Sequence, residues 1–515
     1  MRKYIIIIIC LSFHFVASSQ NQYYPNIKHD NTWVFGAGSW GNTFMTFDSN
    51  KIQLKIVKPT KLGMGTCSSM MSNTDGKLLF YTNGVSILNN QNKIIKNGTR
   101  INPGSYMELY NWTDEGLPIK QGSIALSFPD NDSIYQLLHL DLWDISKENS
   151  LFSYSPFYYS TINMKMNNGL GEVTHLNTFV YRDSVSSGQL TACRHANGRD
   201  WWVLLKKPYQ RIYSSYLVTE DTVVFKFDNL IQIQTDTFNE PYGQSMFTPN
   251  GEKFISVSGP RLKTPAYFDI YDFDRCSGSI SNHQRIQFED SLYHIVIGGA
   301  VSSNSRYLYV SRYDYILQFD LEANDILASI DTVAKFDGST SPATGCPNNF
   351  NLAQVAPDGK IYICVGPCAT EYLTVINEPD KKGKDCNVQQ HAIYLGVNNY
   401  FMIPNFPNYK LGALKGSGCD TLEIVGNKEL DYDLYKITIF PNPASDIVQL
   451  SNLPTNGIVK IEIFSTQGYL LDSKNFNTTS SSLDLNIQNY TSGVYIIKVS
   501  TNQQLLSSKK LVIIR

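Results

Sequence analysis

Few residues in this sequence stand in a pattern that could do chemistry, and the first pattern is a glycine-rich stretch. Gly36-Ala37-Gly38-Ser39-Trp40-Gly41 matches GxGxxG, the loop that cradles a dinucleotide pyrophosphate. Such a loop must open a helix, whose N-terminus binds the pyrophosphate, and it needs an acidic residue about 20 positions further on. Here the run 43–47 predicts a strand, and no acidic residue occurs between Asp48 and Asp75. We therefore interpret the glycines as a turn between strands.

Paired carboxylates are the second candidate for chemistry. Asp130 with Asp132, and Asp272 with Asp274, could bind calcium or act as an acid/base pair. A catalytic pair needs a cleft that fixes the separation of its carboxyl groups, and these pairs stand in turn-forming sequence. The sequence has no P-loop, HExxH or GxSxG motif. We predict no catalytic residue, no cofactor and no metal site, and we expect that the protein is not an enzyme.

Two adjacent tryptophans are the third candidate, because an exposed indole can stack on a sugar ring. Trp201 and Trp202 lie in a run that predicts a strand. Side chains alternate along a strand, so only one of the two should point outward. The other should lie in the core.

Cysteines are the last group with reactive side chains. The sequence has nine, of which Cys10 lies in the apolar leader described below, so eight remain in the mature chain. An even number in an exported chain indicates disulfides, whereas zinc would need a second close Cys pair or a His pair at ligand spacing. The sequence does not choose among the three pairings open to the four that lie closest together: Cys346, Cys364, Cys368 and Cys386.

The elements that position these residues repeat along the chain. A two-residue turn signal, most often Asp-Gly or Asn-Gly, precedes a short run rich in aromatic and aliphatic residues that predicts a strand, and such turn signals are typical of β-hairpins. The second residue of each signal stands at positions 31, 76, 132, 198, 251, 305 and 359, of which the first is the loosest match. A second strand, a turn and a final strand follow each signal. We find no amphipathic helix between them.

The spacing of these signals predicts how the strands assemble. The last three spacings are 53, 54 and 54 residues, and four-stranded units at a period near 50 are typical of β-propeller blades. The sequence thus predicts an all-β protein with a propeller of about seven four-stranded blades, with six or eight as alternatives. A series of separate β-sandwiches is the other possibility, but these units are shorter than the roughly 100 residues of a sandwich.

Several motifs add a family resemblance that covers most of residues 22–422. With its WD-repeat-like blades the region resembles a propeller group in surface proteins of Bacteroidota, and the stretch 349–363 looks like the closing blade of that group. The other motifs that carry the resemblance are Asp274-Arg275-Cys276-Ser277-Gly278, Val375-Ile376-Asn377-Glu378-Pro379, the run 404–412 and Gly418-Cys419-Asp420-Thr421-Leu422.

The N-terminus predicts a signal peptide. Arg2 and Lys3 precede an apolar run over 5–16, which is too short for the roughly 20 residues that span a bilayer. The small residues Ala17 and Ser19 stand where a signal peptidase reads, so we expect cleavage before Gln20. No later stretch is apolar enough to cross a membrane, so the mature chain should carry no transmembrane segment.

The C-terminal region predicts a small β domain of its own. Residues 413–433 have the glycines and charges of a linker, and the region 434–515 contains about seven short alternating runs. On this pattern alone we expect an immunoglobulin-like β-sandwich.

The motifs of this region are more specific than its strand pattern. Residues 440–446, 463–468, 492–499 and the terminal 510–513 resemble, in order and position, the type A sorting domain of the type IX secretion system. The residues that carry the resemblance are Pro441, Asn442, Pro443, Gly468, Gly493, Tyr495 and Lys510. The resemblance implies passage through the outer membrane by the type IX machinery, removal of the tail by a sortase-like peptidase, and release or surface attachment. If Gly493 has positive φ, its replacement by valine should impair the domain.

These observations give a domain plan and two competing functions. The plan is a signal peptide at 1–19, a propeller at 20–412, a linker at 413–433 and a sorting domain at 434–515. The formal net charge of −2 provides no field to attract nucleic acid. We expect a secreted or cell-surface protein whose propeller is a scaffold that binds an unknown extracellular ligand. The alternative is an exported hydrolase or lyase that acts on polysaccharide or peptide at the propeller face.

Overall fold

The structure is a computed structural model of the whole chain, and it divides into two compact units, residues 1–421 and 422–515. Each unit is described by itself below. The residues that the structure describes are 20–38, 41–48, 51–58, 62–104, 116–129, 131–142, 156–181, 188–207, 210, 212–231, 243–258, 265–288, 298–420, 437–455, 457–465, 470–501 and 505–515.

The first unit consists of antiparallel sheets that follow one another along the chain. Its described residues form seven groups of three or four strands, and a single parallel pairing of Lys96 with Glu172 joins the second group to the third. The groups are β2 (Thr32–Phe35), β3 (Asn42–Asp48) and β4 (Lys51–Val57); β5 (Ser69–Ser72), β6 (Leu78–Thr82), β7 (Ser86–Asn89) and β8 (Ile94–Thr99); β9 (Ser123–Phe128), β10 (Asn131–Leu140), β11 (Phe157–Asn163) and β12 (Glu172–Tyr181); β13 (Thr191–Arg194), β14 (Trp201–Lys206), β15 (Ile212–Val218) and β16 (Val223–Leu230); β17 (Ser245–Phe247), β18 (Lys253–Ser258), β19 (Ala266–Phe273) and β20 (Ile280–Phe288); β21 (Gly298–Val301), β22 (Tyr307–Arg312), β23 (Tyr315–Asp320) and β24 (Asp331–Lys335); β25 (Ala353–Val355), β26 (Ile361–Ile363), β27 (Thr370–Ile376) and β28 (Val388–Asn399).

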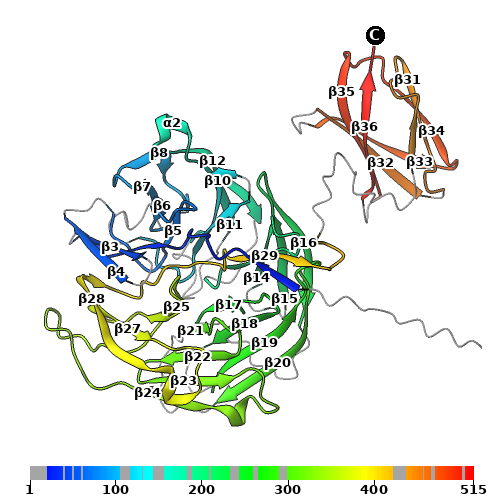
Figure 1. Cartoon of the computed structure of the whole chain (residues 1–515). Coiled ribbons are helices and arrows are strands. Elements are labelled where there is room, and N and C mark those ends of the chain that lie inside the picture. The colour runs from blue at the N-terminus through cyan, green and yellow to red at the C-terminus, as the bar shows by residue number, and fades with distance from the viewer. Residues whose placement is uncertain are drawn as a thin grey trace, which may run out of the picture. The chain divides into compact units, whose positions relative to one another are not determined.

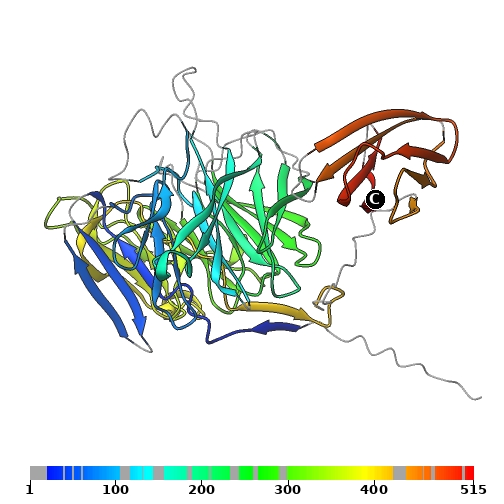
Figure 2. The same ribbon diagram turned by 90° about the horizontal axis from the view of Figure 1, so that it is seen from above.

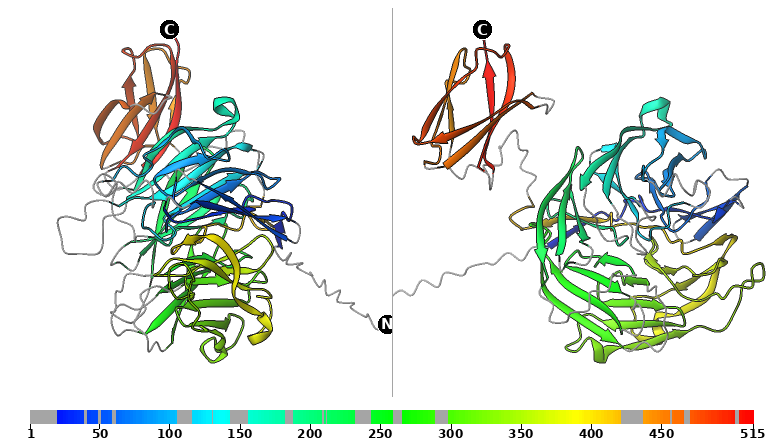
Figure 3. Two further views of the ribbon diagram at one scale, coloured as in Figure 1. Left: turned by 90° about the vertical axis from the view of Figure 1, so that its left-hand side faces the viewer. Right: turned by 180° about the vertical axis from the view of Figure 1, so that it is seen from behind.

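These sheets are arranged in a ring (Figure 1; Figure 3, right). The first strand of one sheet lies against the first strand of the next, as in β2 with β5, β13 with β17, and β21 with β25. The ring closes where β28 of the last sheet contacts β2 and β3 of the first. The described helical segments are short: α2 (Met166–Gly169), η2 (Leu327–Ser329) and η3 (Gly383–Cys386). The prediction of an all-β fold is confirmed.

Most of the predicted turns lie between the first and second strands of a sheet. Gly76, Gly198, Gly251 and Gly359 all have positive φ there. At Gly251 a Cβ would lie 2.8 Å from side-chain atoms of both Arg275 and Leu411, so the position requires glycine for space as well as for φ. The loose first signal is different, because Asn31 precedes β2 instead of following it.

Burial along the strands explains why the sheets need one another. All six residues of β9 are buried, and so are five of the six in β14. The outer strand β16 mixes buried and exposed residues. Inner strands are therefore covered on both faces by neighbouring sheets, which is why Trp201 and Trp202 are both buried and the expectation of an outward tryptophan is wrong.

A two-stranded ribbon brings the two ends of the first unit together. β1 (Gln20–Tyr23) pairs antiparallel with β29 (Leu411–Lys415), with Gln20 opposite Lys415. Figure 2, which views the ring from its edge, shows this ribbon along one face of the ring. The pairing ties the first described residues to the segment that follows the last sheet.

The second unit has a core of its own between two sheets. Its main core residues include Val448, Val459, Ile497 and Leu511, all nearly inaccessible to solvent. The sheets have the orders β30-β31-β34 and β33-β32-β35-β36. Their strands are β30 (Thr438–Phe440), β31 (Ile447–Ser451), β32 (Gly457–Ser465), β33 (Leu470–Thr478), β34 (Ser482–Asn486), β35 (Gly493–Ser500) and β36 (Leu505–Ile513).

Candidate functional site

The glycine-rich stretch near the start is part of the turn between two strands. It separates β2 from β3, so no helix follows it. Ala37 N–H donates to the carbonyl of Asn398 at 2.8 Å, and Met64 N–H donates to the carbonyl of Gly36 at 2.6 Å. The stretch therefore helps to join the first sheet to the last, and its surroundings do not provide a dinucleotide site.

Each described carboxylate of the two predicted pairs has a partner other than the second carboxylate of its pair. Asp132 forms an exposed ion pair with Lys165 at 2.9 Å, while Asp130 lies outside the described residues. Asp272 pairs with Lys253 at 2.9 Å. Asp274 accepts a hydrogen bond from the Cys276 N–H at 2.8 Å and shapes the turn there. Within the described ranges, no three His, Cys, Asp or Glu side chains converge in a way that could hold a metal.

A cavity in the middle of the ring is the feature that sequence reasoning missed. It has a volume of about 310 Å³, and the first strands β13, β17, β21 and β25 line it together with Tyr23 of β1 and Leu411 of β29. Its charged lining residues are Asp30, Arg194 and Lys410. The cavity is thus formed by segments that are far apart in the sequence.

The segment between β28 and β29 crosses the ring and forms one wall of this cavity. The Asn405 side-chain amide donates to the carbonyls of Ser123 at 2.9 Å and Leu190 at 2.8 Å. Asn408 donates to the carbonyl of Pro249 at 2.8 Å, and the Tyr409 hydroxyl donates to the carbonyl of Ala125 at 2.6 Å. These bonds attach the segment to several sheets at once, so it closes the centre of the ring. The two asparagines of Asn405-Phe406-Pro407-Asn408 are the one signal in the sequence that could have pointed to it.

Arg194 is the most unusual charge in the cavity wall. Its side chain is only 2% exposed, and its guanidinium carbon lies 3.6 Å from the centre of the Trp201 ring. Nη1 donates to the carbonyls of Ser127 at 3.2 Å and Arg199 at 2.9 Å. Burial lowers the pKa of Arg194 to about 9, which still leaves it a cation at neutral pH. Nothing at positions 191–194 of the sequence indicates this burial.

Asp30 adds a buried carboxylate to the same cavity, and burial raises its pKa to about 6 from the ordinary 3.8. The folded state therefore binds more protons than the unfolded state between those pH values. The free energy of unfolding consequently falls as pH rises from about 4 to about 6, because the buried carboxyl group must then carry a charge. We predict that Asp30→Asn raises the free energy of unfolding at pH 7.5 by about 1–3 kcal/mol and leaves it nearly unchanged at pH 4. Urea titrations at the two pH values measure this, and an equal effect at both would contradict the assignment.

In the second unit, the Pro441-Asn442-Pro443 turn is held to the last strand. Asn442 donates from its side-chain amide to the carbonyl of Lys510 at 2.6 Å and accepts from the Val512 N–H at 2.8 Å. Lys510 lies on β36 opposite Ile496 of β35. The motif residues Asn442 and Lys510 are thus in direct contact.

Two further motif residues lie on or beside β35. Tyr495 is 9% exposed, and its hydroxyl donates to the carbonyl of Thr491 at 2.9 Å. Gly493 lacks a positive φ, and an added Cβ would lie 3.6 Å from the nearest atom, in the Tyr495 ring. The condition for harm by Gly493→Val is therefore not met. Gly468 lies outside the described residues.

The family comparison decides what this unit is. Residues 438–514 match the family model of the secretion system C-terminal sorting domain. The tail is thus a type IX sorting domain, which implies export by the type IX machinery and a location outside the cell or on its surface. No curated protein matches the chain at a significant level.

Solved structures with some likeness to the chain come from unrelated functional classes. Kuenenia stuttgartiensis hydrazine synthase is 11% identical, covers 74% of this chain and 99% of its own, and has a TM-score of 0.35. A candidate 6-phosphogluconolactonase from Bacteroides uniformis is 11% identical, covers 58% of this chain and 78% of its own, and has a TM-score of 0.34. At such scores neither likeness carries an argument about this protein.

At the other end of the exported chain, Gln20 is the first residue of β1, while Ala17 and Ser19 lie outside the described residues. No helix in the described part of the chain has both the length and the apolar character needed to cross a membrane.

Among the described residues two disulfides are present, in agreement with the prediction of disulfides from an even number of cysteines in an exported chain. Cys346 bonds to Cys368, whereas Cys364 and Cys386 are buried thiols, so the four closest cysteines form one bond. Burial raises the pKa of the Cys364 thiol to about 12 and that of Cys386 to about 11, which makes both unreactive.

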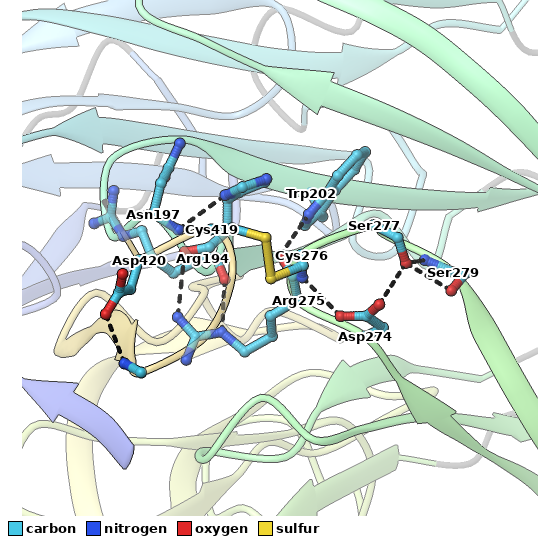
Figure 4. Close-up of a disulfide and its surroundings, with 12 residues drawn as sticks. Arg194, Asn197, Trp202, Asp274, Arg275, Cys276, Ser277, Ser279, Cys419 and Asp420 are labelled. Carbon is cyan, nitrogen blue, oxygen red and sulfur yellow. Dashed lines mark hydrogen bonds between the residues drawn. A yellow bond between two sulfur atoms is a disulfide. The ribbon is translucent and has the colours of Figure 1, made fainter. Parts of the chain in front are cut away.

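The second disulfide joins Cys276 to Cys419, with 5.8 Å between their Cα atoms (Figure 4). It connects the turn between β19 and β20 to the segment after β29. The neighbouring Arg275 donates to the carbonyls of Arg194, His195 and Gly412 and to the Asn21 side chain. The disulfide and Arg275 together attach the β1–β29 ribbon to the ring.

Proposed function

We propose that this protein is an exported binding protein, in which a seven-bladed β-propeller is the binding scaffold and the sorting domain is the export signal. The observation that carries the proposal is the sorting-domain match at 438–514. The ring of consecutive antiparallel sheets, closed by β28 against β2 and β3, supports the propeller. Loops on one face of such a ring are suited to contact an extracellular partner.

The remaining domain assignments are part of the same proposal. A signal peptide at 1–19 directs the chain across the inner membrane, the propeller spans 20–412, and the sorting domain spans 434–515. The linker predicted at 413–433 begins later, because β29 and the Cys276–Cys419 bond attach its first residues to the ring. The type A motifs support passage through the outer membrane of a member of the Bacteroidota. A sortase-like peptidase then removes the tail, an immunoglobulin-like sandwich.

The second candidate is an exported hydrolase or lyase that acts on polysaccharide or peptide. The observation in its favour is that the cavity gathers Asp30, Arg194 and Lys410 on one surface. A typical glycosidase needs two carboxyl groups across the scissile bond, and Asp30 is the sole carboxylate among the described residues that line the cavity. We therefore prefer the binding function.

Protease treatment of intact cells of the native host tests the proposal. We expect an antibody against the propeller to detect the protein in the medium or on the surface, where added protease removes it. A periplasmic protein that resists protease until the cells are lysed would contradict the proposal. Release of reducing ends from polysaccharides by the purified protein would favour the hydrolase instead.

A further inference from the structure

The outer strands of the last sheet carry a pair of accessible tyrosines. Tyr372 of β27 and Tyr394 of β28 are directly opposite each other, with their ring centres 5.3 Å apart. Tyr394 is 59% exposed, which makes it the most exposed Phe, Tyr or Trp residue in the described part of the first unit. Cross-strand aromatic pairs stabilise sheets, so the pair by itself does not identify a binding site.

A bulge in β28 adds a histidine to the same surface. Regular alternation would place residues 391 and 394 on opposite faces of the sheet, because they are an odd number of positions apart. In the structure, however, residues 390–392 of β28 all lie opposite the single residue Thr374 of β27. His391 has a φ of 42° in this bulge, and its ring forms a T-shaped contact with Tyr372, with ring centres 6.2 Å apart. The bulge thus re-aims His391 toward the tyrosine pair.

The segment that follows β24 places polar groups beside these rings. Nε2 of His391 lies 2.7 Å from Oδ2 of Asp337 and 3.0 Å from Oγ of Ser339. The Asp337 N–H donates to the side-chain oxygen of Gln390 at 3.2 Å, and the Ser339 N–H donates to Oδ1 of Asp337 at 3.0 Å. These bonds fix the carboxylate, hydroxyl and imidazole in one arrangement. The side chains of Asp337 and His391 nevertheless remain 39% and 28% exposed, so a ligand can reach them.

This combination fits a sugar ring better than a protein or a nucleic acid. A pyranose has an apolar face of C–H groups that can pack on an aromatic ring, and its hydroxyl groups both donate and accept hydrogen bonds. A stable protein interface buries about 800 Å² on each partner, whereas two aromatic side chains supply at most about 500 Å². The carboxylate of Asp337 repels phosphate groups, which disfavours a nucleic acid.

We propose that the surface formed by Asp337, Ser339, Tyr372, His391 and Tyr394 binds a neutral sugar unit of an extracellular polysaccharide. One face of the sugar ring stacks on Tyr394, and its hydroxyl groups bond to the carboxylate of Asp337 and the hydroxyl of Ser339. None of these residues lines the central cavity. The inference rests on the proposed function, for which it names the class of ligand.

Calorimetric titration of the full mature chain with oligosaccharides in low-salt buffer tests the inference. The probes are cellohexaose, maltohexaose and mannohexaose, which are neutral and differ in linkage or hydroxyl geometry, and hexagalacturonate, which carries a carboxylate on each unit. We expect a neutral probe to bind, and hexagalacturonate to bind at least roughly threefold more weakly, because Asp337 repels its carboxylates. Hexagalacturonate that binds as tightly as the best neutral probe would overturn the neutral-sugar assignment. Absence of binding by all four probes would overturn the site.

Tyr394→Ala locates the site on the molecule. We expect this variant to bind the best neutral probe at least about tenfold more weakly, because the stacking ring is removed. The fold should survive, since the ring is largely exposed. Phe225→Ala is the matched control, because Phe225 is 44% exposed on the outer strand β16 of another sheet, and its binding should equal that of wild type. Unchanged binding by Tyr394→Ala, or an equal loss in both variants, would overturn the site.

Asp337→Asn tests the polar half of the surface. The amide retains a hydrogen-bond acceptor but removes the charge, so we expect the discrimination against hexagalacturonate to disappear. A role for Asp337 in the fold alone would not change the ratio of the two affinities. Discrimination that persists in this variant would overturn the contact between Asp337 and the sugar.

The location of the protein separates this inference from the proposed function. A protein that is found outside the cell and binds none of the oligosaccharides would overturn the inference and leave the proposed function standing. A protein that is confined to the periplasm and binds a neutral oligosaccharide through Tyr394 would do the reverse.

Discussion

Deletion of residues 434–515 should abolish the appearance of the protein outside the cell and leave a folded ring in the periplasm. The signal peptide proposed at 1–19 would direct the chain across the inner membrane only, so passage through the outer membrane needs a second export signal, which the sorting domain supplies. The ring should survive because its sheets and the second unit have separate cores. Fractionation of the native host measures the export, with an expected fall of more than tenfold.

Two controls make this experiment specific. All six tryptophans lie before residue 203, so tryptophan fluorescence of the truncated protein reports whether the ring is folded. Gly493→Val is a point-mutation control, because Gly493 lacks a positive φ and has space for a side chain, so this variant should be exported normally. If the truncated protein appeared outside the cell in wild-type amounts, the tail would not be the export signal.

The strands were predictable because their signals are local. Asn250-Gly251 and Asp358-Gly359 place positive φ between two strands, and short runs rich in aliphatic and aromatic residues follow each turn. The tail was predictable for a different reason, since its motifs and their position at the terminus are specific. In both cases a few neighbouring residues carry all the information.

The sequence pattern failed where the answer depends on a distant segment. Alternation along β14 implied that one tryptophan faces solvent, but the adjacent sheet covers that face as well, so Trp201 and Trp202 are both buried. The cavity escaped prediction because its walls come from β1, from the first strands of several sheets and from the segment that contains Asn405. Arg194 looks like any strand-end arginine until the fold buries it.

The Cys276–Cys419 bond is the other case of a distant partner, and its removal should have the largest effect on stability. The bond closes a loop of 143 residues, and restriction of the unfolded chain grows with loop length. We expect the Cys276→Ser, Cys419→Ser double variant to lose about 3–5 kcal/mol in the free energy of unfolding. Urea titration of the full mature chain measures the loss. Tryptophan fluorescence is the signal to follow, because it reports the unfolding of the first unit alone.

The other disulfide provides the matched comparison. Cys346–Cys368 closes only 22 residues, so the corresponding double variant should lose about 1–2 kcal/mol less than the Cys276–Cys419 variant. Thiol titration of the denatured, unreduced wild type should find the four thiols of Cys67, Cys193, Cys364 and Cys386. Cys419 follows β29, so loss of its bond frees the end of the β1–β29 ribbon. Limited proteolysis should therefore cut after residue 415 sooner in the Cys276→Ser, Cys419→Ser variant than in wild type. A wild type that unfolds at the same urea concentration as the Cys276–Cys419 variant would contradict a closed bond at this position.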